Sequence, residues 1–199
     1  MPHADFVHLR VRSAFSLLES TVRLKDLVAR CRELEMPAVA VTDSANLFAA
    51  MAFGEAARAQ GVQPILGCAL PLAAAAEGHR PGGRPTAPEP LVLLVKDEEG
   101  WRNLMALVSA AHLAATEGRV ETTLDDLTRH GRGLIALTGG PDGPVGAALA
   151  RGDRAGAERL VLELARLFPD RLYVELQRHG LPEEARIEPG RVVLEMTET

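Results

Sequence analysis

The chain has 199 residues, 47% of them hydrophobic, and a formal net charge of -5. This length allows one domain with a sizeable core, and the negative charge excludes a global basic surface that follows a phosphate backbone. Cys31 and Cys68 lie far apart without a CxxC pattern, so we expect buried thiols in a reducing cytoplasm. No apolar run approaches the ~20 residues that span a bilayer, and residues 1–5 lack the features of a signal peptide.

The first predicted element is a strand in "HLRVRSAF", residues 8–15. Leu9 and Val11 are its regularly spaced apolar residues. The period of two then puts Arg10 and Arg12 together on the opposite face. Two permanent cations on one face of a strand are unusual and call for an explanation.

The next elements alternate between helix and strand. Residues 22–35 have the apolar spacing of a helix, "MPAVAVTD" predicts a buried strand, "NLFAAMAFGEAARAQ" a helix that Gly61 ends, and "VQPILGCALPL" a third strand. The order β-α-β-α-β favours a parallel sheet or barrel, with functional residues at the carboxyl ends of the strands.

Residues 73–90 are rich in alanine, glycine and proline, which predicts a surface excursion. Beyond it, "PLVLLVKD", "GLIALTGG" and "DRLYVELQRHG" predict strands, while "EEGWRNLMALVSAAHLAA" and "GDRAGAERLVLELARLF" predict helices. Asp153 lies near the positive amino end of the latter helix. "TGGPDGPVG" lacks the lysine of a phosphate-binding loop and the GxGxxG spacing, so we interpret it as a turn.

The predicted strand ends offer few metal ligands. Only Asp43 and His179 have suitable side chains there, and Arg10 and Arg12 would repel a cation. Asp43 also suits a turn or a helix cap, and His179 also suits a hydrogen-bonded loop. The serines near the first strand do not identify a catalytic triad by spacing alone.

Several collinear stretches carry a resemblance: "FVHLRVRSAFSLLES", "MPAVAVTDSANLFAAMAFGEAARAQGVQPILGCAL", "GWRNLMALVSAAHL", "GLIALTGG" and "LFPDRLYVELQRHGLPEE". Over residues 5–190 the chain resembles the N-terminal PHP (polymerase and histidinol phosphatase) domain of bacterial replicative DNA polymerase III alpha subunits. The resemblance implies an α/β fold, a PHP-type distorted (β/α)7 barrel that we expect to be truncated at its C-terminal end. It also implies a PHP domain over 1–190 and a divergent or truncated tail over 191–199.

The resemblance further implies a degenerate metal site. In the family the first strand carries two histidines separated by one residue, and Arg10 and Arg12 take these places. An acidic residue follows in "LLDG", and Glu19 in "LLES" matches it. The ligand set continues with "TDHGN", which is "TDSAN" here, so that Asp43 is kept and Ser44 replaces a histidine.

Two further positions complete the recognisable part of this pattern. Ala69 in "GCA" replaces the family's glutamate, whereas His179 in "ELQRHG" matches a family histidine. The family's last Asp and His ligands are expected beyond the recognisable region. We therefore expect no catalytic residue and no bound metal.

Arginine only donates hydrogen bonds and keeps its charge, so it cannot ligate a metal. We hypothesise that Arg10 or Arg12 pairs with Glu19 or Asp43, and that this pairing replaces the attraction between metal and carboxylate. The alternative is that both arginines point to solvent.

The resemblance implies a structural and interaction domain that supports a DNA-directed DNA polymerase in DNA replication. Its partners would be the rest of the polymerase chain, the proofreading exonuclease subunit and the replisome, with DNA reached only through the full-length protein and no membrane contact. Magnesium is expected for the full-length polymerase, and the location is cytoplasmic. The alternatives are an active metal-dependent phosphoesterase, such as a 3′-5′ exonuclease, and the error-prone polymerase subunit.

Overall fold

The computed structural model describes residues 4–73, 89–116, 118–177 and 193–195. Within these residues a five-stranded sheet has the order β1-β2-β3-β4-β5, and a two-stranded sheet pairs β6 with β7. The strands are β1 Ala38–Ser44, β2 Gln63–Leu72, β3 Glu89–Val95, β4 Leu134–Leu137, β5 Leu172–Tyr173, β6 Glu175–Gln177 and β7 Val193–Glu195. The predicted strand "DRLYVELQRHG" is thus divided between the two sheets.

The helices match the predicted apolar spacing, with two additions. They are α1 Leu24–Glu33, α2 Ala50–Ala59, α3 Glu98–Leu113, α4 Leu124–His130, α5 Pro144–Ala150 and α6 Arg154–Leu167, and a short 3-10 turn, η2, covers Gly140–Asp142. Asp153 accepts a hydrogen bond from the Gly156 amide and caps α6, in agreement with its predicted place. Helices α4 and α5 were not predicted. None of the described helices has the length and apolar character that a membrane crossing requires.

Strand direction agrees only in part with the predicted parallel sheet or barrel. Strands β1 and β2 are parallel, as are β4 and β5, but β3 is antiparallel to both of its neighbours. One helix between two strands returns the chain to its starting end and gives parallel strands. Two helices, α3 and α4, connect β3 to β4 and bring the chain back to the end that it left. The unpredicted α4 therefore accounts for the antiparallel pairing of β3 with β4.

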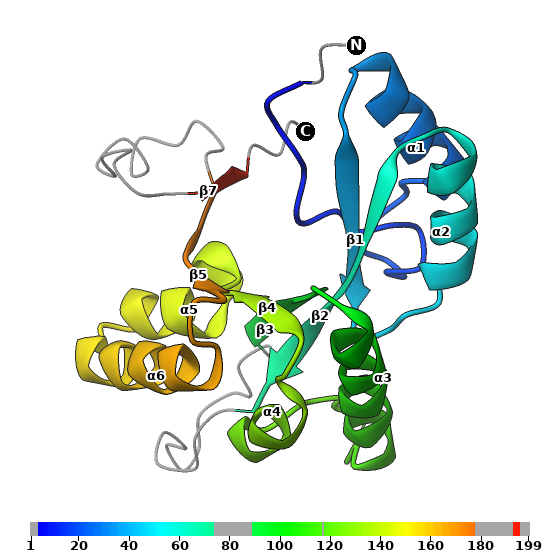
Figure 1. Ribbon diagram of the computed structural model, residues 1–199. Helices are drawn as coiled ribbons and strands as arrows, with labels where there is room; N and C mark the ends of the chain where they lie inside the picture. The colour runs from blue at the N-terminus through cyan, green and yellow to red at the C-terminus, as the bar shows by residue number, and fades with distance from the viewer. Residues whose placement is uncertain (1–3, 74–88, 117, 178–192, 196–199) are drawn as a thin grey trace.

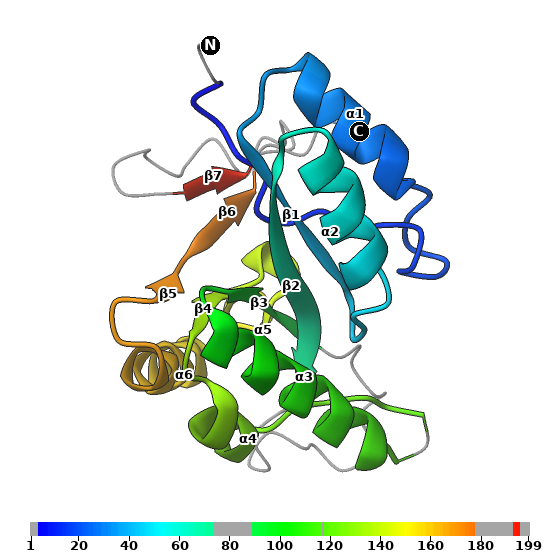
Figure 2. The same ribbon diagram turned by 45° about the vertical axis from the view of Figure 1, so that its right-hand side comes forward.

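The α/β class is confirmed, but the predicted barrel is not closed within the described residues. The sheet runs from β1 at one edge to β5 at the other, and β6 and β7 form a separate ribbon (Figures 1 and 2). Closure requires continuous hydrogen bonding around the whole circle. In the described part of the chain this ladder stops after β5, whose pairing with β4 is only two residues long.

The predicted first strand is wrong: the segment lies beside β1 without forming a regular ladder. It makes one isolated parallel bridge, between His8 and Val39. The amide of Ala40 donates to the carbonyl of His8, and the amide of Thr42 donates to the carbonyl of Val11. Regular parallel pairing would move two residues along both chains, whereas here the first segment moves three. This extra residue is a bulge, and it breaks the alternation of side chains.

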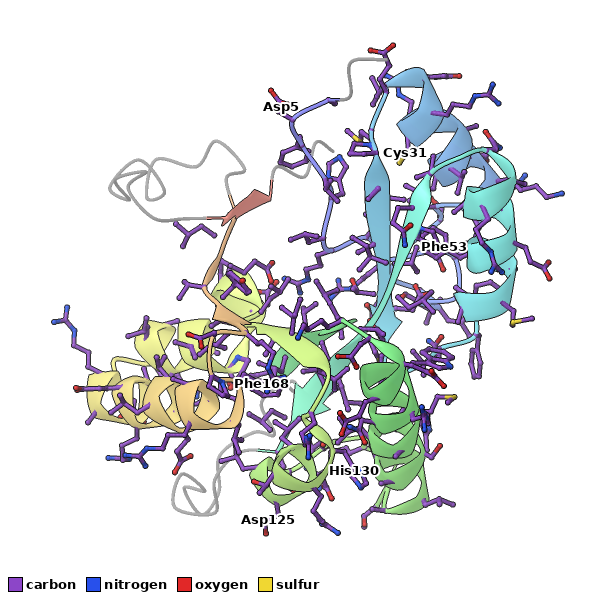
Figure 3. The ribbon with its side chains drawn as sticks, viewed as in Figure 1. Asp5, Cys31, Phe53, Asp125, His130 and Phe168 are labelled. Atoms are coloured by element: carbon purple, nitrogen blue, oxygen red, sulfur yellow. The ribbon has the colours of Figure 1, made fainter. Side chains whose placement is uncertain are left out.

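Helices cover one face of the sheet in two groups. Helices α1 and α2 pack on β1 around Phe53, and α3, α4 and α6 pack on β2 to β4 around Phe168 (Figure 3). A third cluster lies on the other face and includes Ala40, Ala69 and Val92. Because this face carries only small or medium side chains near Ala69, it leaves room for a cleft beside the carboxyl ends of β1 and β2.

Candidate functional site

The Arg10 side chain is buried, and its partners lie far from it in the sequence. Its Nη1 donates to Glu175 Oε1 at 2.6 Å and to the carbonyl of Gly139 at 3.1 Å. The side chains of Arg10 and Glu175 are 8% and 2% exposed. The predicted partners, Glu19 and Asp43, are therefore wrong for Arg10, and the alternative that it points to solvent is wrong as well.

Two segments position the acceptors of Arg10: the turn at residues 138–140 and the start of β6. Gly139 and Gly140 both adopt left-handed backbone conformations, with φ of 81° and 61°. A side chain at Gly139 would collide with the carbonyl oxygen of Pro90. The Glu175 amide donates to Thr138 Oγ1 at 3.0 Å, which fixes the start of β6 beside the turn. The predicted turn in "TGGPDGPVG" is confirmed, and it presents a carbonyl to Arg10.

Arg12 has a different environment at the surface. Its Nε lies 3.2 Å from Glu19 Oε2, and the two side chains are 35% and 43% exposed. Ser44 Oγ donates to the same Glu19 oxygen at 2.6 Å. Arg12, Glu19 and Ser44, three positions of the predicted site, are thus brought together. The pairing of Arg12 with Glu19 is one of the pairings that the sequence predicted.

Asp43 is buried, and serines surround its carboxylate. Oδ1 accepts hydrogen bonds from the Ser13 amide and from Ser16 Oγ, and Oδ2 accepts one from Ser13 Oγ, all at 2.7 Å. Only 1% of Asp43 is exposed. No arginine pairs with it in the described structure, so the predicted pairing of an arginine with Asp43 is not observed. Ser13 and Ser16 are partners that sequence reasoning missed.

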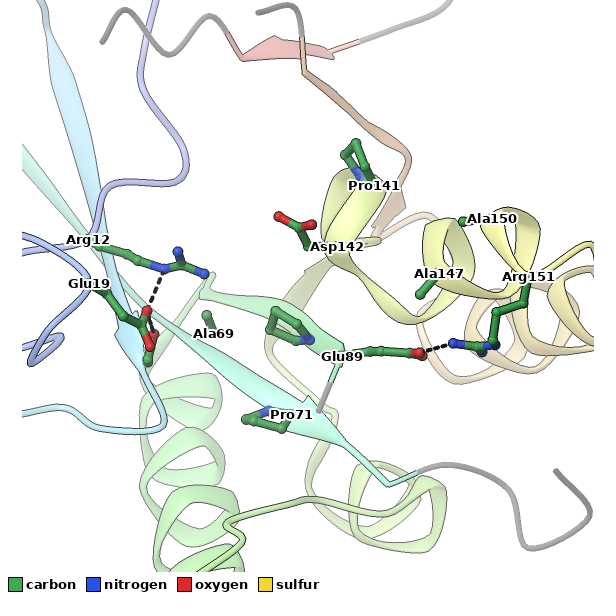
Figure 4. Close-up of a pocket in the computed structure, with 12 residues that line it drawn as sticks. Arg12, Glu19, Ala69, Pro71, Glu89, Pro141, Asp142, Ala147, Ala150 and Arg151 are labelled. Carbon is green, nitrogen blue, oxygen red and sulfur yellow. Dashed lines mark hydrogen bonds and ion pairs between the residues drawn. The ribbon is translucent and has the colours of Figure 1, made fainter. Parts of the chain in front are cut away.

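The position of Ala69 opens onto a cleft of about 680 Å³. Arg12 and Glu19 lie on one side of it, and Asp142 and Arg151 lie on the other side (Figure 4). Ser44 also lines the cleft. The predicted His179 lies outside the described residues. The cleft is therefore formed from most of the described positions of the predicted site, whereas Arg10 and Asp43 are not among its lining residues.

The two thiols are buried. Burial, together with the nearby charge of Asp43, raises the pKa of Cys68 to about 12. The Cys68 thiol donates to the carbonyl of Asp43 at 3.4 Å. Burial also raises the pKa of Cys31. Neither thiol has the thiolate character that a metal ligand or a nucleophile needs near neutral pH.

The described donor set does not fit a metal ion. Within residues 4–73, 89–116, 118–177 and 193–195, no three His, Cys, Asp or Glu side chains converge closely enough to hold one. Asp43 uses both oxygens on serine donors, Glu19 is engaged by Arg12 and Ser44, and guanidinium groups have no lone pair to offer. We therefore derive no chemistry through a metal at this site.

The family model of the PHP domain matches residues 8–179 of this chain. The chain belongs to the PHP domain family. This confirms the resemblance predicted from the collinear stretches. The boundary at 190 and the tail at 191–199 stay predictions, because most of that region lies outside the described residues.

Curated relatives of this PHP domain are named DNA polymerase III subunit alpha. The protein from Caulobacter vibrioides is 45% identical over 188 residues, which are 94% of this chain and 16% of that protein. The protein from Pseudomonas aeruginosa is 38% identical over 87% of this chain and 14% of its own length, and that from Thermus aquaticus is 38% identical over 92% and 15%. The chain thus spans about a sixth of the length of these relatives.

Among solved structures, an amidohydrolase from Chromobacterium violaceum aligns over 85% of both chains. Its sequence identity is 13% and its TM-score is 0.46. The family assignment therefore rests on the sequence match. Glu175 is the residue that sequence reasoning missed most clearly, and its only signal was an acidic residue in the predicted last strand, "DRLYVELQRHG".

Proposed function

We propose that this PHP domain acts without a metal as a structural and interaction domain of a DNA polymerase III alpha subunit. The observation that carries the proposal is the occupation of the site: Arg10 binds Glu175, Arg12 binds Glu19, and serines bind Asp43. The positions Arg10, Arg12, Glu19, Asp43, Ser44, Ala69 and His179 then form a degenerate metal site.

The ion pairs cross-link the segments of the site, as a bound metal would. A cation that binds carboxylates from several segments ties those segments together. Arg10 connects the first segment to the start of β6, and Arg12 connects it to Glu19 and, through that carboxylate, to Ser44. Arginine provides this link at all ordinary pH values and without dependence on metal supply, because its guanidinium stays protonated.

The role in replication is supported by the curated relatives named DNA polymerase III subunit alpha. In this role the domain supports the rest of the polymerase chain in the cytoplasm and receives the proofreading exonuclease subunit and the replisome. DNA is reached through the full-length protein, because the net charge of -5 disfavours phosphate tracking. Magnesium belongs to the polymerase reaction, which needs acidic residues to hold two ions.

The test measures the metal content of the 199-residue chain and its hydrolysis of a primer. After dialysis against zinc, manganese or magnesium, we expect substoichiometric metal and no manganese-stimulated 3′ exonuclease activity on a labelled primer. The competing function is an active metal-dependent phosphoesterase. Stoichiometric metal, together with hydrolysis that disappears in His179→Ala, would establish that function and overturn the proposal.

A further inference from the structure

The cleft beside Ala69 has two polar walls and an apolar floor. Arg12 and Glu19 form an ion pair on one wall, and Glu89 and Arg151 form an ion pair on the other (Figure 4). Small or rigid apolar residues lie between them, among them Ala69 and Pro71, and form the floor (Figure 4). A volume of about 680 Å³ is enough for a few residues of an extended peptide.

The charges of this cleft do not cancel. Each arginine is matched by a glutamate, which leaves Asp142 as the additional charge of the lining. Asp142 is exposed, and it has no hydrogen bond or ion pair within the part of the chain that the structure describes. A cationic group can therefore approach this carboxylate without displacing a partner from the described residues.

The backbone around the cleft offers few amide hydrogen-bond donors. Pro71, Pro90 and Pro141 line it and have no amide hydrogen. Arg12 engages Glu19 through Nε, and its terminal nitrogens point away from Glu19 into the cleft (Figure 4). These nitrogens are suited to donate to a carbonyl oxygen of a bound chain.

We propose that the cleft binds an extended basic segment of a partner protein. A lysine or arginine side chain of that segment pairs with Asp142, its aliphatic part lies on the proline and alanine floor, and a backbone carbonyl accepts from Arg12. This site rests on the proposed interaction function and names the class of partner. An anionic ligand is disfavoured because Glu19, Glu89 and Asp142 outnumber the two arginines.

Nuclear magnetic resonance titration of the 199-residue chain tests the site with blocked peptides. The probes are acetyl-Ala-Arg-Ala-amide, the same peptide with uncharged citrulline, and the same peptide with glutamate. We expect the amide signals of Ala69, Ala147 and Ala150 to shift with the arginine peptide. The Asp142→Asn variant should bind it about five-fold more weakly, as fits one exposed ion pair. It should no longer distinguish arginine from citrulline.

The control is Asp125→Asn, the same chemical change at an exposed aspartate of α4 outside the cleft lining. Ala150→Phe, at an exposed position that lines the cleft, should block binding without removing any charge. Equal binding of the citrulline peptide, preference for the glutamate peptide, or full binding by Ala150→Phe would each overturn the proposal. These results leave metal content unchanged, so the metal assay separately tests the proposed function.

Discussion

Arg10 and Arg12 are two residues apart in the chain but belong to different physical environments. Arg10 is in a buried ion pair, with side-chain exposures of 8% and 2% for the two partners. Arg12 is in a half-exposed pair, with exposures of 35% and 43%. The same residue type in the same motif therefore has two roles. Arg10 connects distant parts of the chain, whereas Arg12 shapes the wall of a cleft.

Burial decides how much each pair matters when it is broken. Removing one partner of a buried pair leaves the other charge in a medium of low polarity, which is strongly destabilising. Removing one partner of an exposed pair lets water solvate the other, so the loss is small. The predictions below test this difference, starting with the largest expected effect.

The Arg10→Met substitution should lower the free energy of unfolding by about 3 to 5 kcal/mol, because it leaves the buried Glu175 carboxylate without its guanidinium partner. Urea unfolding followed by circular dichroism measures this change. The matched control is Arg12→Met, which removes the same groups from a half-exposed position. Similar losses in the two variants would contradict the difference between the sites.

The Asp43→Asn substitution should lower the free energy of unfolding by about 1 to 3 kcal/mol, an intermediate effect. Three donors from Ser13 and Ser16 reach the two carboxylate oxygens, and the amide group of asparagine would place its own hydrogens against one of these donors. The same urea unfolding measurement applies. Asp142→Asn is the control because Asp142 is exposed. A loss in that control as large as in Asp43→Asn would remove the explanation.

The sequence predicted the composition of the sheet better than its connections. Apolar runs identified β1, β2, β3 and β4, since a buried strand leaves a continuous signal. The short helix α4, "LDDLTRH", has few apolar residues and was missed, although Thr123 and Asp126 form a capping box at its start. This omission reversed the expected direction of β4 relative to β3, because strand direction depends on the number of helices that cross between the two strands.

Sequence separation decided which part of the candidate site could be predicted. The pairing of Arg12 with Glu19 is local, so the motif contained both partners. Arg10 pairs across 165 positions of the chain, and nothing in its neighbourhood indicates Glu175. The bulge between His8 and Val11 separates the two arginines, and a rule based on a period of two has no means to detect one extra residue.

A double-mutant cycle should detect a small coupling between Arg12 and Glu19. We expect Arg12→Ala and Glu19→Gln to be non-additive by about 0.2 to 1 kcal/mol, the range of exposed ion pairs. Thermal or urea unfolding of the two single variants and the double variant gives this coupling. Because Ser44 also donates to Glu19, Ser44→Ala in each variant separates the hydrogen bond from the ion pair. Strict additivity would mean that the observed pair contributes no stability.

The two ion pairs should also differ in how their coupling energies respond to salt. The screening length falls from about 10 Å at 0.1 M salt to about 3 Å at 1 M, and exposed charges are screened much more than buried ones. We therefore expect the Arg12–Glu19 coupling to fall towards zero as sodium chloride is raised over this range. The coupling measured with Arg10→Met and Glu175→Met should remain nearly constant, because water and ions do not reach side chains that are 8% and 2% exposed. Equal salt dependence in the two cycles would show that Arg10 is as accessible in solution as Arg12, and it would remove the burial argument for treating the two arginines differently.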